Sequence, residues 1–216
     1  MKQVLQNLSN GSTKVAEVPC PIKKDNHALI QSTLSLISTG TEKMLVDFGK
    51  SNLIDKALSQ PEKVKMVLEK IKTDGIIPTA ESVFSKLDQP IDLGYSNVGK
   101  IIEPNNTVFS VGDRVISNGN HAEIVRVSKN LICKIPDSVD DKTAAFTVVA
   151  SIALNGIRLI DPKIGDYVVV YGLGLIGLLA VQILIANGCN VIGVDLEEEK
   201  CKLCEQYGGK SINPTK

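Results

Sequence analysis

The chain has no tryptophan and few other aromatic residues, which together make up 4% of its 216 residues. Proteins that bind single-stranded nucleic acid stack the bases on aromatic side chains, so this shortage argues against such a platform. An excess of charge is also missing, because 24 lysines and arginines balance 24 aspartates and glutamates. With no net charge, nothing steers the chain toward nucleic acid or an anionic membrane.

The first residues contain no basic segment followed by an apolar core. No signal peptide is therefore visible, and the cytoplasm is the expected location. The five cysteines form no even disulfide framework. Cys201 and Cys204 have the spacing of half a zinc site, but no second pair or histidine cluster accompanies them. We interpret this pair as small residues packing one face of a helix, in preference to metal or redox chemistry.

One stretch carries a strong motif. A β-branched run leads into Gly172-Leu-Gly-Leu-Ile-Gly177, an apolar helical pattern follows, and a second β-branched run ends at Asp195. Three glycines at this spacing between a strand and a helix, with an acid closing the next strand, form the dinucleotide-binding fingerprint. The sequence therefore predicts a βαβ unit that binds a dinucleotide.

Each glycine of the motif has its own physical role. Gly172 permits the tight turn after the strand, Gly174 leaves the backbone open to a pyrophosphate, and Gly177 lets the helix pack close to the sheet. The N–H groups and positive end of the helix would hold the phosphate charge. Two alternatives are weaker: a membrane span over residues 168–186, whose first half holds the three glycines, and a coincidental glycine pattern in an ordinary βαβ unit.

Asp195 sets the expected cofactor. Its carboxylate can accept hydrogen bonds from both hydroxyl groups of an adenosine ribose, and it would repel a 2′-phosphate. We therefore expect NAD, with NADP disfavoured, and a small molecule as the substrate.

The remaining sequence indicates two domains, over residues 1–150 and 151–216. In the first, short strands separated by Gly, Asn, Asp and Pro predict a small β-barrel. A helical insertion interrupts it at about residues 42–88, where Pro61 is placed to begin a helix and Gly75 to end it. The fold class expected is α/β.

The order of these parts resembles the medium-chain dehydrogenase/reductase superfamily of alcohol dehydrogenases and quinone oxidoreductases. The matching segments are Val-Gly-Asp-Arg-Val (111–115), His-Ala-Glu-Ile-Val (121–125), Lys-Ile-Pro-Asp-Ser-Val (134–139) and the glycine motif (168–177). Residues 38–45 and the helical insertion are similar to the amino-terminal part of two-domain oxidoreductases of polysaccharide gene clusters. The resemblance implies a GroES-like barrel domain followed by the first half of a Rossmann doubly wound parallel sheet.

The resemblance also implies where a catalytic zinc would be bound. Thr39 stands where zinc-dependent members have a cysteine before Gly-Thr-Asp, and Tyr95 stands where Gly-His-Glu supplies a histidine. Residues 146–150, which would hold the third ligand, include no Cys, His, Asp or Glu. Because a catalytic zinc needs three protein ligands, we predict no metal.

Without zinc, hydrogen-bond donors must polarise the substrate carbonyl together with the nicotinamide. Tyr95 and Thr41 are candidates at matched positions, since Tyr95 replaces a ligand and Thr41 matches the hydroxyl that passes the proton in alcohol dehydrogenases. His121, one of two histidines, lies in a barrel loop, and histidines titrate near neutrality. For each of the three, packing or loop hydrogen bonding is the competing interpretation.

On the cofactor side the family pattern adds residues beside the glycines and the acid. Leu175 and Ile176 lie within the motif, and Ile176 would lie under the nicotinamide. Lys200, five residues after Asp195, can reach the ribose or be a surface lysine.

The expected function is that of a zinc-independent, NAD(H)-dependent oxidoreductase for a small carbonyl or hydroxyl compound, which the finer resemblance suggests is sugar-derived. Two alternatives stay open: an NADPH-dependent quinone or enoyl reductase, against which Asp195 argues, and a nucleotide-binding protein that does no chemistry. A doubly wound sheet has two halves, and one is present. We expect a fragment whose second half lies in the same or a partner chain, and a homo-oligomer when complete.

Overall fold

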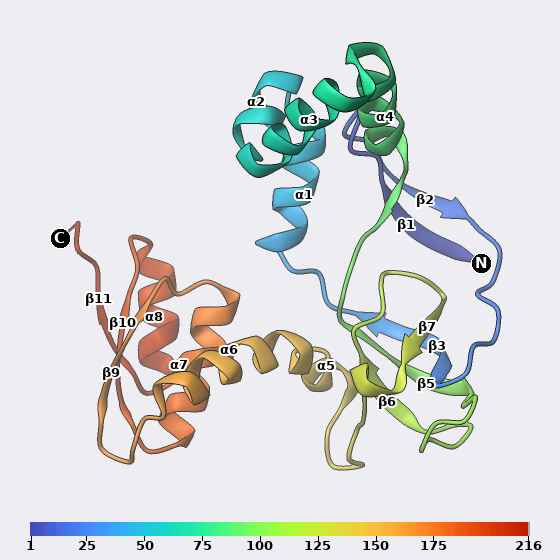
Figure 1. The fold of residues 1–216 in the computed structure, drawn as a ribbon. Coiled ribbons are helices and arrows are strands. Elements are labelled where there is room, and N and C mark those ends of the chain that lie inside the picture. The colour runs from blue at the N-terminus through green and yellow to red at the C-terminus, as the bar shows by residue number, and fades with distance from the viewer. Residues whose placement is uncertain (216) are drawn as a thin grey trace. The chain divides into compact units, whose positions relative to one another are not determined.

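The computed structural model in Figure 1 describes residues 1–215. The chain divides into two compact units, Met1–Lys134 and Ile135–Lys216. This division lies before residue 150, where the sequence suggested a boundary. The reason is that helix α6 (Thr147–Ile160) packs on α7 (Leu175–Ala186) and buries Ile157 in the core of the second unit.

The first unit contains two antiparallel sheets. One has the strand order β2-β1-β4, built from Thr13–Glu17, Lys2–Gln6 and Ile91–Asp92. The other has the order β7-β3-β5-β6-β8, built from Ile124–Ser128, His27–Ser35, Asn97–Glu103, Arg114–Ser117 and Ile132–Lys134. A 3-10 turn over Lys129–Leu131 precedes β8, and a single bridge between Gln3 and Ala122 joins the sheets. The apolar core of the five-stranded sheet centres on Ala28, Ile30, Ile101, Val115, Val125 and Val127.

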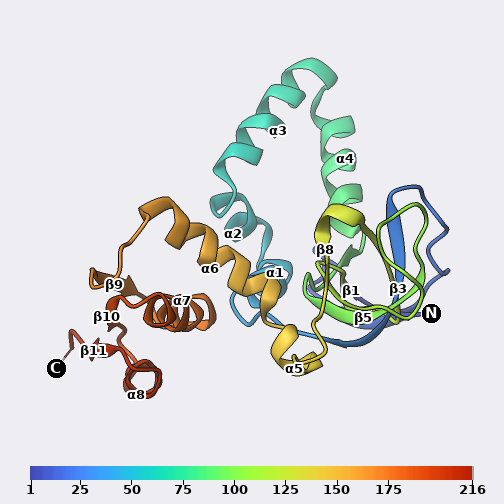
Figure 2. The ribbon, with the colours of Figure 1, turned by 90° about the horizontal axis from the view of Figure 1, so that it is seen from below.

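Four helices lie between β3 and β4, where the sequence predicted a helical insertion without specifying how many helices it holds: α1 (Thr41–Lys50), α2 (Leu53–Leu58), α3 (Pro61–Asp74) and α4 (Ile76–Asp88). Helix α3 has Pro61 at its first turn and ends at Gly75, whose positive φ of 87° suits a residue without a Cβ atom. Figure 2 shows α3 and α4 side by side as a helical hairpin.

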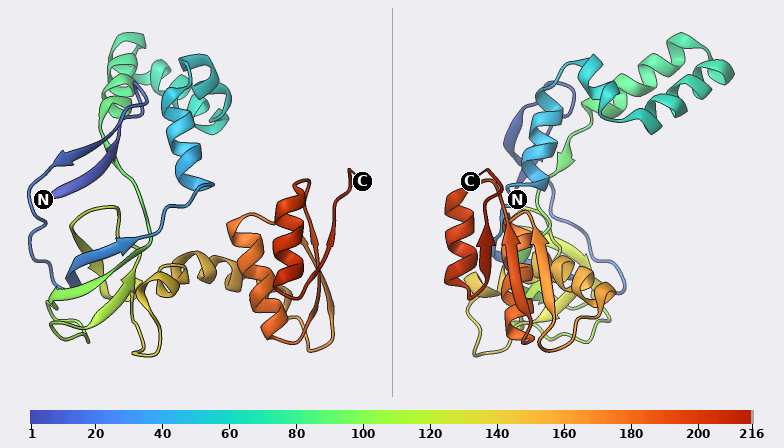
Figure 3. Two further views of the ribbon diagram at one scale, coloured as in Figure 1. Left: turned by 180° about the vertical axis from the view of Figure 1, so that it is seen from behind. Right: turned by 90° about the vertical axis from the view of Figure 1, so that its left-hand side faces the viewer.

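The second unit begins with α5 (Asp141–Ala144), which Asp140 caps, and α6. Its sheet is parallel with the order β11-β10-β9, from Lys210–Ile212, Asn190–Val194 and Tyr167–Tyr171. Figure 3 shows these strands next to one another, and Figures 1 and 2 show α7 and α8 (Glu198–Gln206) on one face. The predicted alternation of strand and helix is therefore confirmed.

The two faces of this parallel sheet differ. The face toward α7 and α8 is apolar and closed, with Leu173, Val181, Leu184, Val191, Cys201 and Cys204 at its core. On the other face Tyr167, Val169, Tyr171 and Ile212 are largely exposed. Over the described residues no helix has the length and apolar character needed to cross a membrane. The apolar run that suggested a span is divided between β9, the glycine turn and the 12 residues of α7.

Candidate functional site

The glycine turn joins β9 to α7 and has the geometry that its three glycines were predicted to permit. Gly172 has a φ of 84°, in the region that disfavours any residue with a side chain. A Cβ atom on Gly174 would meet nothing within 4 Å, so the backbone there faces open space. A Cβ atom on Gly177 would overlap the carbonyl oxygen of Gly172. The third glycine thus lets the first turn of the helix lie against the start of the loop.

The amino end of α7 is open to an anion. Gly174 is its N-cap residue and supplies no side-chain hydrogen bond, and the first turn carries no acidic residue. The first N–H groups of a helix have no partner within the helix, and they carry the positive end of its dipole. Leu175 is half-buried, whereas Ile176 is 42% exposed. The completely buried Leu173 anchors the turn in the core.

Asp195 lies against this turn, as the fingerprint requires. Its Oδ2 atom accepts a hydrogen bond from the backbone N–H of Leu173 at 2.7 Å, and its Oδ1 atom accepts one from Glu197 at 2.9 Å. These bonds hold the pKa of Asp195 below its ordinary value, and the bond from the Glu197 N–H lowers this pKa the most. The carboxylate is therefore charged and fixed beside the glycines.

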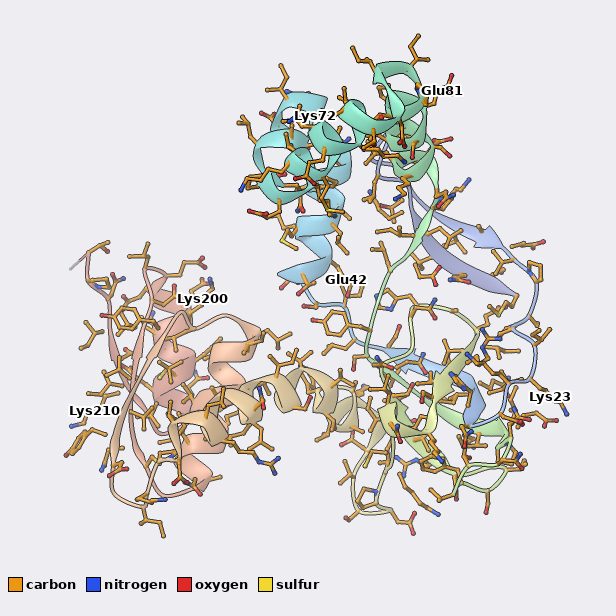
Figure 4. The ribbon with its side chains drawn as sticks, in the orientation of Figure 1. Lys23, Glu42, Lys72, Glu81, Lys200 and Lys210 are labelled. Atoms are coloured by element: carbon orange, nitrogen blue, oxygen red, sulfur yellow. The ribbon has the colours of Figure 1, made fainter. Side chains whose placement is uncertain are left out.

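Lys200 lies on α8, where Figure 4 labels it, and its side chain pairs with a neighbour. The Nζ atom is 2.7 Å from Oε1 of Glu197, and this bond raises the pKa of the lysine. Asp195 adds a smaller electrostatic contribution of the same sign. Lys200 is thus close enough to the site to interact with Asp195, while its direct partner is Glu197.

A second cluster lies in the first unit, around His121. The Nδ1 atom of His121 is 2.8 Å from Oγ of Ser35, and its Nε2 atom is 2.8 Å from Oε2 of Glu42. The side chains of His121 and Glu42 are 10% and 8% exposed. Figure 4 shows Glu42 at the amino end of α1. Of the three catalytic candidates, His121 is the one that the structure places in a hydrogen-bonded group.

The other two candidates flank this cluster in the sequence. Tyr95 follows Gly94, whose backbone packs on the His121 ring, and Thr41 precedes Glu42 as the first residue of α1. Thr41 is exposed and Tyr95 is half-buried. Among the described residues, neither hydroxyl forms a hydrogen bond with another residue.

Sequence reasoning missed Glu42 and Ser35. Glu42 has a signal, because it closes the Thr-Gly-Thr-Glu segment that was compared with Gly-Thr-Asp, yet nothing in the pattern pairs it with a histidine 79 positions away. Ser35 has no signal, since serine is common at the ends of strands.

Possible metal ligands and the Cys201–Cys204 pair were the other candidate features of the sequence. No group of three or more His, Cys, Asp or Glu side chains suited to a metal occurs over residues 1–215. Cys201 and Cys204 are buried on α8, and a Cβ atom on Gly193 or Gly209 would approach the Cys204 sulfur within 2.6 or 2.8 Å. This close contact favours a packing role for the pair.

Known proteins are similar to this chain over parts of their length, although no family model matches it. An alcohol dehydrogenase of Moraxella sp. (strain TAE123) is 38% identical over 94 residues, which are 43% of this chain and 28% of that protein. A D-guloside 3-dehydrogenase of Escherichia coli (strain K12) is 36% identical over 129 residues, or 56% of this chain and 37% of that protein.

The fold is also found among solved structures. That of galactitol-1-phosphate dehydrogenase from Escherichia coli has a TM-score of 0.75 at 19% identity, and the match covers 100% of this chain and 62% of that one. In each of the three comparisons the match covers less than two thirds of the known protein.

Proposed function

We propose that this chain, as a member of the medium-chain dehydrogenase/reductase superfamily, forms the substrate-side domain and the first nucleotide-binding half of an NAD(H)-dependent oxidoreductase that works without zinc. The substrate would be a small alcohol or carbonyl compound, with sugar derivatives favoured. The observation that carries this proposal is the hydrogen bond between Asp195 and the N–H of Leu173, because it joins the acid to the glycine turn.

The residues around the turn fit a dinucleotide. The open backbone at Gly174 and the first N–H groups of α7 would hold the pyrophosphate. Each carboxylate oxygen of Asp195 accepts one backbone N–H and has a second lone pair. The acid can therefore accept two ribose hydroxyls without losing the bonds that fix it.

The same charges support NAD over NADP. Glu197 pairs with Lys200, so the positive charge nearest Asp195 is already offset. A ribose 2′-phosphate would meet a net negative surface here, and like charges at short range repel. When bound, the nicotinamide would supply the hydride chemistry, and the chain would supply binding, orientation and proton transfer.

Zinc independence is supported by the residues at the matched ligand positions. Thr39 and Tyr95 replace a thiolate and an imidazole, and the segment 146–150 offers Phe, Thr, Val, Val and Ala. Hydroxyl groups are poor substitutes for the nitrogen and sulfur ligands that zinc prefers.

Turnover by the intact protein tests this function. NADH formation would be measured with ethanol, galactitol 1-phosphate and methyl D-guloside as probes, and NADH oxidation with the matching carbonyl compounds, in buffer treated with a chelator. We expect at least one probe to react with NAD at an undiminished rate after chelation. Complete loss of the rate on chelation, with recovery on adding zinc, would contradict the proposal, as would binding of neither dinucleotide.

A further inference from the structure

Helices α3 and α4 form a hairpin that extends from the strands of the first unit, as the right-hand view of Figure 3 shows. Helix α3, described along its whole length, has no buried residue, and α4 buries Thr79 alone among its 13 described residues. The helices pack on each other, and their half-buried apolar residues lie along the seam between them: Val64, Val67, Ile71, Val83 and Leu87. The rest of the hairpin surface is open.

One open side of this hairpin is apolar. The Nζ atom of Lys70 donates a hydrogen bond to Oγ of Ser82 at 3.2 Å, which marks one edge of the seam. Two positions along a helix are about 200° of rotation, so residues two apart lie on opposite sides. Leu68 lies two positions before Lys70, and in the same way Phe84 lies two positions after its bonded serine. Leu68 and Phe84 therefore lie together on the side away from this bond.

This side carries three exposed apolar side chains. Leu68, Ile77 and Phe84 are 54%, 72% and 52% exposed. Ile77 precedes Phe84 by about two helical turns, so the two share one side of α4. Single exposed apolar residues are common on protein surfaces, whereas a group that spans two helices marks an interaction site. We call Leu68, Ile77 and Phe84 the apolar face of the hairpin.

Opposite charges flank the two edges of the apolar face. On α3, Lys65 and Lys72 are three positions before and four positions after Leu68, the spacings that place them beside it. On α4, Glu81 and Asp88 each follow an apolar residue of the face by four positions. Figure 4 shows Lys72 on the α3 side of the hairpin and Glu81 on the α4 side. One rim of the face is therefore basic and the other is acidic.

A face with one basic and one acidic rim complements a second copy of itself. When two hairpins meet face to face about a two-fold axis parallel to their helices, α3 of one copy lies opposite α4 of the other. The basic rim of each copy then meets the acidic rim of its partner. A two-fold axis across the helices would instead set α3 on α3 with lysine against lysine, and like charges disfavour that arrangement.

The rim charges also match in height along the helices. With a rise of ~1.5 Å per residue, Lys72 and Glu81 lie about 3 and 8 Å from the ends of their helices nearest Gly75. Lys65 and Asp88 lie about 14 and 18 Å from the same ends. Each lysine is thus within the length of its own side chain of the level of one acidic residue. Lys72 can pair with the partner's Glu81, and Lys65 with the partner's Asp88.

We propose that the apolar face of the α3–α4 hairpin is a homodimer interface, in which two hairpins form a four-helix bundle. Lysines and acidic residues are equal in number over residues 41–88, so the hairpin has no surplus charge to attract an anionic membrane or a nucleic acid. A second copy needs no such surplus, because its rims supply the matching charges. This inference concerns assembly and does not depend on the proposed function.

The size of the face sets the strength of the dimer. Two helices of this length present a face of about 20 by 20 Å, so pairing buries roughly 800 Å² in total. Permanent dimers bury more than twice as much, and contacts of this size are weak and reversible. The dimer should therefore form in a concentration-dependent way.

The first test compares two exposed apolar positions in the intact protein. Phe84→Glu places a charge in the apolar face. Met66→Glu is the matched control, because Met66 is 66% exposed and lies two positions before Leu68, on the other side of α3. Sedimentation equilibrium would give the assembly mass over a range of concentrations, and circular dichroism would show whether each variant is folded. We expect Phe84→Glu to halve the assembly mass and Met66→Glu to leave it unchanged.

The second test reverses the rim charges. Lys72→Glu and Glu81→Lys each set like charges together twice in a symmetric dimer, so we expect each variant to dimerise roughly tenfold more weakly. An equal mixture of the two variants restores opposite charges at both edges of a heterodimer. The mixture should therefore recover the wild-type affinity, a result that charge pairs within one copy would not give.

Other results would overturn the proposal. A wild type that is monomeric at every concentration would exclude the dimer. An unchanged mass in Phe84→Glu, even with lower stability, would show that the apolar face packs within its own chain and not on a second copy. Equal losses of mass in Phe84→Glu and Met66→Glu would place the contact elsewhere. A mixture that associates no better than either charge variant alone would contradict the pairing of the rims.

Discussion

The two units each fix one carboxylate by hydrogen bonds, and they do so in different ways. Asp195 in the second unit is held by two backbone N–H groups, from Leu173 and Glu197. Glu42 in the first unit is held by one backbone N–H and by the side chain of His121. A carboxylate held by backbone groups alone presents charge to a ligand, whereas one paired with an imidazole can compensate a proton that moves.

The largest effect should come from Gly177→Ala in the glycine turn. Its new Cβ atom would overlap a backbone oxygen, which cannot move aside as a flexible side chain can. We expect the free energy of unfolding to fall by about 3 kcal/mol, at the upper end for an overpacked site. Denaturant titration would measure the loss. Gly174→Ala is the matched control, and it should leave stability nearly unchanged because its Cβ atom meets nothing within 4 Å.

Equal stability of these two alanine variants would mean that the turn is not packed as described. NADH binding by Gly174→Ala would separate the roles of the two glycines. Weaker binding with unchanged stability would show that Gly174 is needed for the ligand, whereas Gly177 is needed for folding.

The next effect should come from Glu42→Ala. Removing the carboxylate leaves the ring of His121 and the N–H of Ser38 without their acceptor in a site where the glutamate is 8% exposed. We expect a loss of about 2 kcal/mol at neutral pH, since groups left unpaired on burial cost more than the pair contributed. Thermal unfolding would measure it. Glu62→Ala, at an exposed site on α3, should change stability little.

A smaller effect is expected for Asp195→Asn, and it should depend on pH. The pKa of Asp195 is lower in the folded state than in the unfolded chain, so its stabilising contribution is present above about pH 4 and is lost as the pH falls through the folded value. The variant should be about 1 kcal/mol less stable than the wild type at pH 7. The difference should shrink toward zero in acid. If the difference in stability between the variant and the wild type does not change with pH, the folded state does not stabilise the charged form of Asp195.

The smallest change in stability is expected for Gly156→Ala, at a position away from both carboxylates. Gly156 lies in the interior of α6, is exposed, and would place a Cβ atom in open space. Gly156→Ala should therefore stabilise the second unit by about 0.5–1 kcal/mol, the difference in helix propensity. A loss of stability in thermal unfolding would mean that another surface packs on this face of α6.

The second unit could be predicted well because its signals are local. Strand, glycine turn, helix, strand and acid follow one another, and the bond from Leu173 to Asp195 spans 22 positions. In the insertion, Pro61 and Gly75 mark the ends of α3 by their own backbone preferences. Such features act through neighbouring residues, and a sequence shows them directly.

The first unit resisted prediction where its structure depends on long-range contacts. The pairing of β1 with the two-residue strand β4 joins residues more than 80 positions apart, and no periodicity marks so short a strand. The partners of His121 come from positions 79 and 86 residues away. The unit boundary at Lys134 depended in turn on how α6 packs, which its apolar pattern alone did not specify.

The most direct test of the central claim is a titration of the intact protein and of Asp195→Asn with NADH and NADPH, followed by nucleotide fluorescence. The account predicts that the wild type binds NADH at least tenfold more tightly than NADPH. The preference should largely disappear in Asp195→Asn, because the variant can still hydrogen-bond but no longer repels a phosphate. Equal affinities in the wild type, or a preference that survives the substitution, would contradict the claim that Asp195 and the glycine turn select the nucleotide.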